Sequence, residues 1–364
     1  MSADRAVTRK TAPRGDEPRQ AKRPESLAGD PPLISILLPA FDAEPTLTAC
    51  LRSIERQTEP RWECVVVDDG SGDGTLDCAR SFAEKDRRFV TTGLGSHRGL
   101  VSALNHGIGL CRGSFVARMD ADDLMHRERL AAQVRALGAE PELAAVGCHV
   151  RLFPRAGLRA GFRAYEAWLN GIDSSLRVRA EAFVECPIAH PSLMIRRELL
   201  AGLGYRDRGW PEDYDLILRL LDLGHAIGVV PARLLSWRAG SARLSMRSPA
   251  YAIERFTACK AAFLAAGFLA GDDSYVLWGY GHTGRALRRA LLALGKQPSH
   301  VVELHPGRLG NTIHGAPVVS PAALASIPRR PVVVSVAGAG PRAEIRAALE
   351  RMGFVESRDF VCAA

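Results

Sequence analysis

Two aspartates in the spacing D-x-D, Asp120 and Asp122, directly follow an apolar run over residues 115–119. Carboxylate oxygens are ligands that Mg²⁺ and Mn²⁺ prefer, and Mg²⁺ usually binds one or two carboxylates together with substrate phosphates. An ion at this turn would neutralise a diphosphate and stabilise it as a leaving group. The spacing therefore predicts a site for phosphate chemistry. A solvated turn with helix-capping aspartates is the alternative, and D-x-D alone does not exclude it.

The elements around these aspartates follow a regular alternation. The predicted strands cover residues 33–38, 62–67, 90–92, 115–119 and 143–150, and the predicted helices cover 47–54, 76–83, 100–108 and 130–137. Nearly continuous apolar strands that alternate with helices are typical of an α/β fold with a mostly parallel sheet. Ligands of such sheets bind beyond the carboxyl ends of the strands, and Asp68, Asp69, Asp120, Asp122 and Asp123 fall there.

The pattern is weaker after residue 150. Residues 151–186 are expected to be irregular, 190–196 to form a short strand, and 212–223 and 251–269 to form helices. The acidic pair Glu212 and Asp213 opens the first of these helices. Acids in a first turn stabilise a helix through its dipole, so this pair has a purely structural interpretation.

Four motifs, in this order, resemble those of the family 2 glycosyltransferases of GT-A fold. They are Pro39 to Glu44, Val65 to Thr75 with Asp68-Asp69-Gly70-Ser71, Asp120-Ala121-Asp122-Asp123, and Pro211-Glu212-Asp213-Tyr214-Asp215. The resemblance covers about residues 33–246. It implies an inverting, metal-dependent transferase that moves a hexose-type sugar from a nucleotide-diphosphate sugar to a hydroxyl. The acceptor would be a glycan or a lipid-linked intermediate, as in cell-surface polysaccharide biosynthesis.

The resemblance also implies roles for single residues. The nucleotide pocket would be lined by Pro39, Ala40, Phe41, Asp42 and Glu44, with Arg98 near the nucleotide. Asp69 would accept a hydrogen bond from the base, Asp120 would lie near ribose and diphosphate, and Asp122 would ligate Mg²⁺ or Mn²⁺. Asp213 would be the catalytic base, which a carboxylate can be because the acceptor proton leaves only as the new bond forms. Arg238 or Arg243 would reach the diphosphate.

Asp42 stands where this family commonly has asparagine. The resemblance favours a UDP-sugar donor, and this departure leaves GDP and dTDP open. A sugar nucleotidyltransferase is an alternative, but it would want a glycine-rich loop with a basic residue after the first strand, and residues 39–44 contain neither glycine nor a basic residue. A non-catalytic nucleotide-sugar binding protein is a further alternative, against which Asp122 and Asp213 both argue.

A glycine-rich turn, Gly279-x-Gly281-x-x-Gly284, follows a predicted strand at 275–278 and precedes a predicted helix. Glu303 comes about 20 residues later, as in the dinucleotide fingerprint, where an acid binds a ribose hydroxyl. The segment resembles small Rossmann-like nucleotide-binding modules appended to sugar-modifying enzymes. Residues 279, 281, 284 and 303 are therefore a candidate second ligand site. A degenerate module used for packing or dimerisation is the alternative.

The chain has 364 residues, a net charge of +8 and 47% hydrophobic residues. We expect a disordered basic tail (1–32), a GT-A domain (33–248), a helical connector (249–270) and a small Rossmann-like α/β domain (271–364). No apolar run approaches the roughly 20 residues of a membrane span. No dense basic run with interleaved aromatics indicates nucleic acid. Eight cysteines without a C-x-x-C pair favour reduced thiols in the cytoplasm. Peripheral contact with the inner face of the membrane and homo-oligomerisation stay open.

Overall fold

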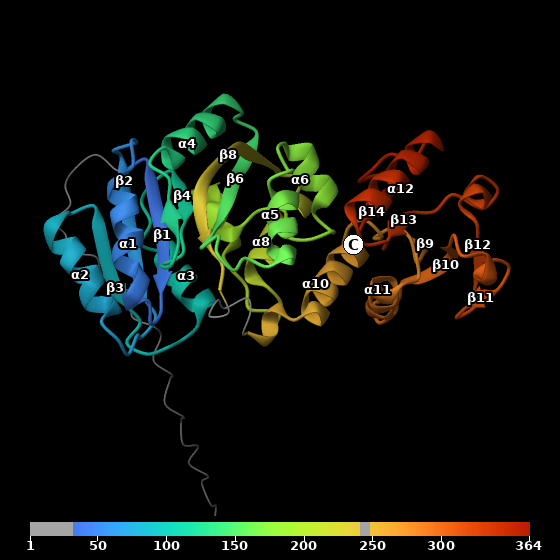
Figure 1. Cartoon of the computed structure of the whole chain (residues 1–364), viewed down its shortest axis with the longest axis horizontal. Coiled ribbons are helices and arrows are strands. Elements are labelled where there is room, and N and C mark those ends of the chain that lie inside the picture. The colour runs from blue at the N-terminus through green and yellow to red at the C-terminus, as the bar shows by residue number, and fades with distance from the viewer. Residues whose placement is uncertain (1–31, 241–247) are drawn as a thin grey trace, which may run out of the picture. The chain divides into compact units, whose positions relative to one another are not determined.

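The structure is a computed structural model that describes residues 32–240 and 248–364. The expected tail, apart from Pro32, and Arg243 lie outside these residues. The larger of two sheets has the strand order β3-β2-β1-β4-β7-β6-β8-β5. Its strands are β1 (Ile34–Ala40), β2 (Trp62–Asp68), β3 (Phe89–Gly93), β4 (Phe115–Arg118), β5 (Leu124–Met125), β6 (Leu143–Phe153), β7 (Met194–Arg196) and β8 (Ala226–Arg238). Figure 1 labels β1, β2, β3, β4, β6 and β8 among these strands.

Most neighbours in this sheet run parallel, as the alternation predicted. The pairs β1–β2, β1–β4, β2–β3 and β6–β8 are parallel, whereas β4–β7, β6–β7 and β5–β8 are antiparallel. Its helices are α1 (Glu44–Glu55), α2 (Thr75–Lys85), α3 (Leu100–Ile108), α4 (Arg129–Ala139), α5 (Ala160–Leu169), α6 (Ser175–Glu181), α7 (Arg197–Leu203), α8 (Glu212–Asp222) and α10 (Ile253–Ala266).

Helices cover both faces of the larger sheet because the strands are apolar on both. On β1, Ile36 and Leu38 pack with Leu47 of α1 in one core. Leu37 points to the other face and packs with Leu104 of α3 in a second core. All seven residues of β1 are buried, which is the burial expected of a central parallel strand. The α/β prediction with a mostly parallel sheet is therefore confirmed.

Two predictions about residues 151–196 were wrong in detail. Residues 151–186 are not irregular, because they include α5 and α6. The strand expected over 190–196 begins only at Met194. Before it lies a single 3₁₀ turn, η1 (His190–Ser192), which contains Pro191. Proline lacks the N–H that a central strand needs for its ladder, so the strand cannot begin earlier.

A second, six-stranded sheet has the order β11-β12-β10-β9-β13-β14. Its strands are β9 (Ser274–Trp278), β10 (Gln297–Val302), β11 (Thr312–Ile313), β12 (Ala316–Val319), β13 (Val332–Val334) and β14 (Phe360–Cys362), with helices α11 (His282–Leu292) and α12 (Ala339–Arg351). The remaining 3₁₀ turns are η2 (Pro249–Tyr251), η3 (Pro306–Arg308) and η4 (Pro321–Ala325). All strand pairs except β11–β12 are parallel. The expected domain boundaries stay a prediction.

No helix among the described residues is both long enough and apolar enough to span a bilayer.

Candidate active site

A cavity of about 300 Å³ brings together acidic side chains from two distant parts of the chain. Asp120 and Asp122 come from the turn between β4 and β5, and Glu212 and Asp213 from the first turn of α8. These residues lie about 90 positions apart in sequence. The structure therefore places three of the predicted site residues, Asp120, Asp122 and Asp213, in one cavity.

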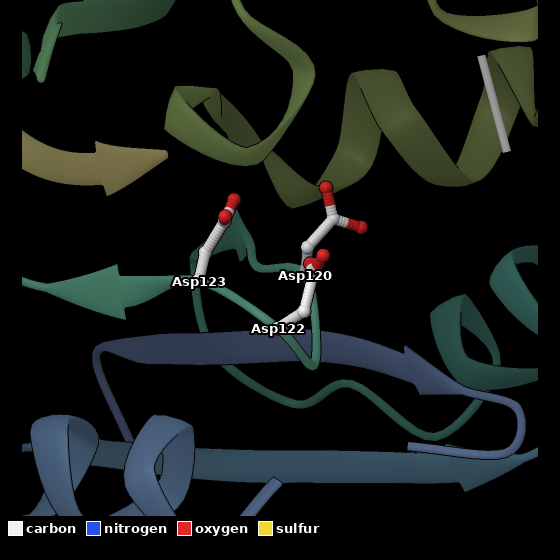
Figure 2. A group of neighbouring side chains, drawn as sticks. All are labelled: Asp120, Asp122 and Asp123. Carbon is white, nitrogen blue, oxygen red and sulfur yellow. The ribbon is translucent and has the colours of Figure 1, made fainter. Parts of the chain in front are cut away.

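Asp120, Asp122 and Asp123 form a compact carboxylate cluster (Figure 2). One oxygen from each lies within 4.8 Å of the others. The turn is held from β8, because Arg238 donates its N–H to Asp123 Oδ1 at 2.7 Å and its Nε–H to the Asp122 carbonyl at 2.7 Å. A set of oxygen donors at this spacing fits a hard divalent cation. Both of these hydrogen bonds from Arg238 thus stabilise the turn. Asp123 lies beside Asp120 and Asp122, the two aspartates of the D-x-D spacing.

Arg118 is a cavity residue that the sequence did not single out. It ends β4, its side chain is only 4% exposed, and its guanidinium forms an ion pair with Asp120. Burial lowers the pKa of Arg118, but the charge of Asp120 outweighs burial and raises that pKa above its usual value. Arg118 is therefore a permanent positive charge among the carboxylates. The only signal for it in the sequence is a charged residue at the end of an apolar run.

Glu212 and Asp213 occupy different surroundings although they are adjacent. Glu212 is buried, and the Tyr251 hydroxyl lies within 2.9 Å of both of its carboxylate oxygens. Asp213 faces the cavity and accepts a hydrogen bond only from the N–H of Tyr214 among the bonds described here, at 2.7 Å. Burial raises the pKa of Asp213 to about 8, and the charge of Glu212 adds to that rise. Raised carboxyl pKa values of this kind are typical of functional acids and bases.

His190 lines the same cavity and lies close to Glu212. Its Nδ1 lies 3.6 Å from Glu212 Oε1, and its Nε2 lies 2.8 Å from the hydroxyl of Tyr205. Burial lowers the pKa of His190 well below its usual value, and Arg118 lowers it further. His190 is therefore a mainly neutral imidazole that hydrogen-bonds Tyr205 and lies close to Glu212.

The turns after β1 and β2 are tied together by hydrogen bonds. Asp42 Oδ1 accepts the N–H of Gly72 at 2.9 Å, and Glu44 Oε2 accepts the N–H of Gly74 at 3.0 Å. Asp42 has a positive φ of 46°. Asparagine and aspartate both tolerate this left-handed region better than other residues. Aspartate can therefore replace the asparagine that the resembling family commonly has here. Pro39 and Ala40 end β1 and are buried.

Asp69 anchors the loop that follows β3. Its carboxylate accepts N–H bonds from Arg98 and Gly99, both at 2.8 Å, and lies 2.9 Å from Nδ1 of His97. The ring of His97 stacks on Phe41 with centroids 4.0 Å apart. Arg98 therefore reaches Asp69 through its backbone, while its side chain is exposed. Phe41 and His97 together form an aromatic surface beside Asp69, and His97 was not among the predicted residues.

Gly70 allows this loop to approach the turn closely. Its φ is +75°, and a Cβ there would lie 2.5 Å from the backbone N of His97. We expect Gly70→Ala to lower the free energy of unfolding by about 2 kcal/mol or more, because backbone strain and overpacking add. Gly95→Ala is the matched control, since Gly95 has a φ of +73° with nothing within 4 Å of its Cβ. Urea unfolding of both variants measures the difference, and equal losses would contradict the close approach.

The C-terminal glycines and Glu303 also meet in the structure. Gly279 follows β9 with a φ of +94°, Gly281 precedes α11, and a Cβ on Gly284 would lie 2.6 Å from Oγ of Ser335. Glu303 Oε1 accepts the N–H of Tyr280 at 2.8 Å and an Nη1–H of Arg308 at 2.9 Å. Glu303, the acid of the dinucleotide fingerprint, is thus already hydrogen-bonded to Tyr280 and Arg308.

The cavity thus combines the D-x-D turn after β4 with the acidic start of α8. Residues 35–204 match the family model Glycosyl transferase family 2. The amylovoran biosynthesis glycosyltransferase AmsE of Erwinia amylovora is 29% identical over 59% of this chain and 79% of its own length. The putative glycosyltransferase EpsE of Bacillus subtilis is 29% identical over 63% and 82%.

Solved structures of another protein share the fold. S. aureus TarS residues 1–349, solved in complex with UDP-GlcNAc, superposes with a TM-score of 0.53 at 19% identity, over 71% of each chain. The complex with UDP gives a TM-score of 0.51 at 18% identity. The GT-A fold is thereby confirmed for the larger sheet. Residues 35–204 therefore match glycosyltransferase family 2, and the curated relatives that the chain resembles are glycosyltransferases.

Proposed function

We propose that this glycosyltransferase moves a sugar by direct displacement with inversion, with Asp213 as the base. The observation that carries the proposal is the cavity in which Asp213 faces the D-x-D turn. The acceptor oxygen forms a bond to the anomeric carbon as the bond from that carbon to the diphosphate breaks. Asp213 takes the acceptor proton during this step, and its raised pKa makes it a stronger base than an exposed aspartate. Tyr251 and His190 hold Glu212 and so fix the start of α8.

Asp122, with Asp120 and Asp123 beside it, is proposed to hold Mg²⁺ or Mn²⁺. When bound, the cation supplies charge that neutralises the departing diphosphate. Arg118 keeps Asp120 oriented through its ion pair. Arg238 keeps the metal-binding turn in place through its two hydrogen bonds to Asp122 and Asp123.

The donor is proposed to be a UDP-sugar, with the base against Phe41 and His97. A carboxylate has about four lone-pair sites, and the groups bound to Asp69 use three of them. One site is then left for an N–H of uracil. The UDP and UDP-GlcNAc complexes of TarS support this choice, since that protein has the same fold.

The acceptor is proposed to be a hydroxyl of a glycan or of a lipid-linked intermediate in the cytoplasm. One relative supports it, because AmsE is an amylovoran biosynthesis glycosyltransferase. For the turn at Gly279, the hydrogen bonds to Glu303 and the close approach at Gly284 favour the packing interpretation. Binding of a nucleotide there stays a prediction.

Calorimetric binding of UDP-, GDP- and dTDP-sugars with and without Mn²⁺ tests the donor and the metal together. We expect a UDP-sugar to bind at least about tenfold more tightly with Mn²⁺. Asp122→Ala should remove that gain, while Asp77→Ala, an exposed aspartate on α2, should retain it. Binding that is unchanged by Mn²⁺ in the unaltered chain, or an Asp122→Ala variant that keeps the gain, would refute the proposed metal site.

A further inference from the structure

Five arginines line a second cavity, of about 670 Å³, which we name the arginine pocket. Arg52 lies on α1, Arg56 directly follows it, Arg127 follows β5, Arg151 lies on β6 and Arg233 on β8. All five are exposed. Residues from four separate segments thus direct positive charge to one concave surface.

The arginine pocket has little compensating negative charge. The residues that line it, as far as the structure describes the chain, include neither Asp nor Glu. Arg127 lies 3.6 Å from Glu128, between two exposed side chains. Within residues 32–240 and 248–364, no acidic side chain forms an ion pair with the other four arginines. Five like charges at one site repel one another, so an anion bound there would stabilise the arrangement.

The arginine pocket is separate from the catalytic cavity, because the two share no lining residue. Strand β8 contributes to both: Trp237 lines the catalytic cavity and Ser236 lines the arginine pocket. Successive residues of a strand point to opposite faces. The diphosphate of the proposed donor, which Asp120 and Asp122 would face, is therefore not the anion for this pocket.

The chemistry of the pocket indicates which anion it takes. Guanidinium groups bind phosphate with two parallel N–H bonds, and they do so better than lysine does. Phe, Tyr and Trp are absent from the described lining, whereas proteins that bind single-stranded nucleic acid stack the bases on such rings. We propose that the arginine pocket binds a phosphate group, carried either by a soluble metabolite or by a lipid headgroup.

Inorganic diphosphate is the probe for the soluble source. Calorimetry in EDTA, without nucleotide, keeps metal-assisted binding at the D-x-D turn out of the measurement. The unaltered chain is expected to bind diphosphate, and Arg151→Gln with Arg233→Gln is expected to raise the Kd at least about tenfold, because two charge-assisted contacts are lost. Arg87→Gln with Arg289→Gln removes the same charge at exposed sites elsewhere and should change the Kd less than about twofold.

Vesicles distinguish the lipid source. Co-sedimentation with phosphatidylglycerol vesicles, compared with phosphatidylcholine vesicles, is measured for the same variants. Loss of both diphosphate and phosphatidylglycerol binding in the pocket variant assigns the phosphate to a lipid, and loss of diphosphate binding alone assigns it to a soluble ligand. Arg52→Gln with Arg56→Gln repeats the test if the first pair impairs folding. Equal diphosphate binding by pocket and control variants, or none by the unaltered chain, overturns the proposal.

Discussion

Replacing Asp213 by asparagine is expected to lower kcat by about a thousandfold, with the affinity for the donor within about twofold of its original value. The amide keeps the size of the carboxyl and can still accept the N–H of Tyr214, but it cannot take the acceptor proton. Single-turnover kinetics with a UDP-sugar, together with donor binding by calorimetry, measures the two quantities separately. Asp222→Asn, an exposed change at the other end of α8, is the control.

The same variant should change the pH dependence in a defined direction. Burial, helped by Glu212, raises the pKa of Asp213 to about 8, so the free enzyme carries the active carboxylate only at higher pH. We therefore expect kcat/KM of the unaltered enzyme to rise with pH and to level off above about pH 8. In Asp213→Asn this rise should be absent. Retained turnover, or an unchanged pH profile, would show that another group takes the proton.

Stability provides a control for the loss of activity. A carboxyl whose pKa is raised in the folded state favours folding at low pH and opposes it as pH rises toward that pKa. At pH 9 the Asp213 carboxylate is charged and poorly solvated, so its removal should raise the free energy of unfolding by at least about 1 kcal/mol. At pH 5 the gain should be smaller. A variant that is inactive but more stable at pH 9 cannot owe its inactivity to unfolding.

The sheet was predictable because its central strands are apolar on both faces. On β1, adjacent residues such as Ile36 and Leu37 enter two different cores, and only a run without polar interruptions permits that. Strand β8 had no counterpart among the predicted strands. Its middle residues, Pro231 to Arg233, are exposed and its pairing with β6 shifts register there. A strand with a proline and an irregular ladder shows neither alternation nor a continuous apolar run.

The sequence could single out candidate site residues only where chemistry and spacing coincide. Asp120 and Asp122 stand out because D-x-D follows a strand, and Asp213 because its motif has a fixed place in the order of four. Tyr251 hydrogen-bonds Glu212 across 39 residues, with no local pattern to reveal it. His97 reaches Asp69 from the next loop in the same way. Contacts of this kind come from tertiary packing, and a single sequence does not encode them in any short spacing.

Arg118 is the residue whose loss should change the electrostatics of the cavity most. It is buried, forms an ion pair with Asp120, and lowers the pKa values of both Glu212 and Asp213 through its charge, although burial outweighs it and keeps both raised. Arg118→Gln removes a buried positive charge that acts on both acids. Breaking a fully buried pair by removing one partner typically costs about 3–5 kcal/mol. Because the side chain of Asp120 is 31% exposed, we expect a smaller loss, of about 2 kcal/mol, in the free energy of unfolding at pH 8.

This loss should depend on pH and on divalent cations. Without Arg118, the pKa values of Glu212 and Asp213 rise further, so protonation relieves the repulsion at pH 6 and the loss is larger at pH 9. Added Mg²⁺ should restore part of the stability, because it supplies positive charge to the carboxylate cluster. Arg219→Gln is the matched control, since Arg219 forms a buried ion pair with Asp215 at 2.6 Å. The loss of stability in Arg219→Gln should not change when Mg²⁺ is added. An equal gain from Mg²⁺ in both variants would show that the stability lost in Arg118→Gln is not linked to cation binding at the carboxylate cluster.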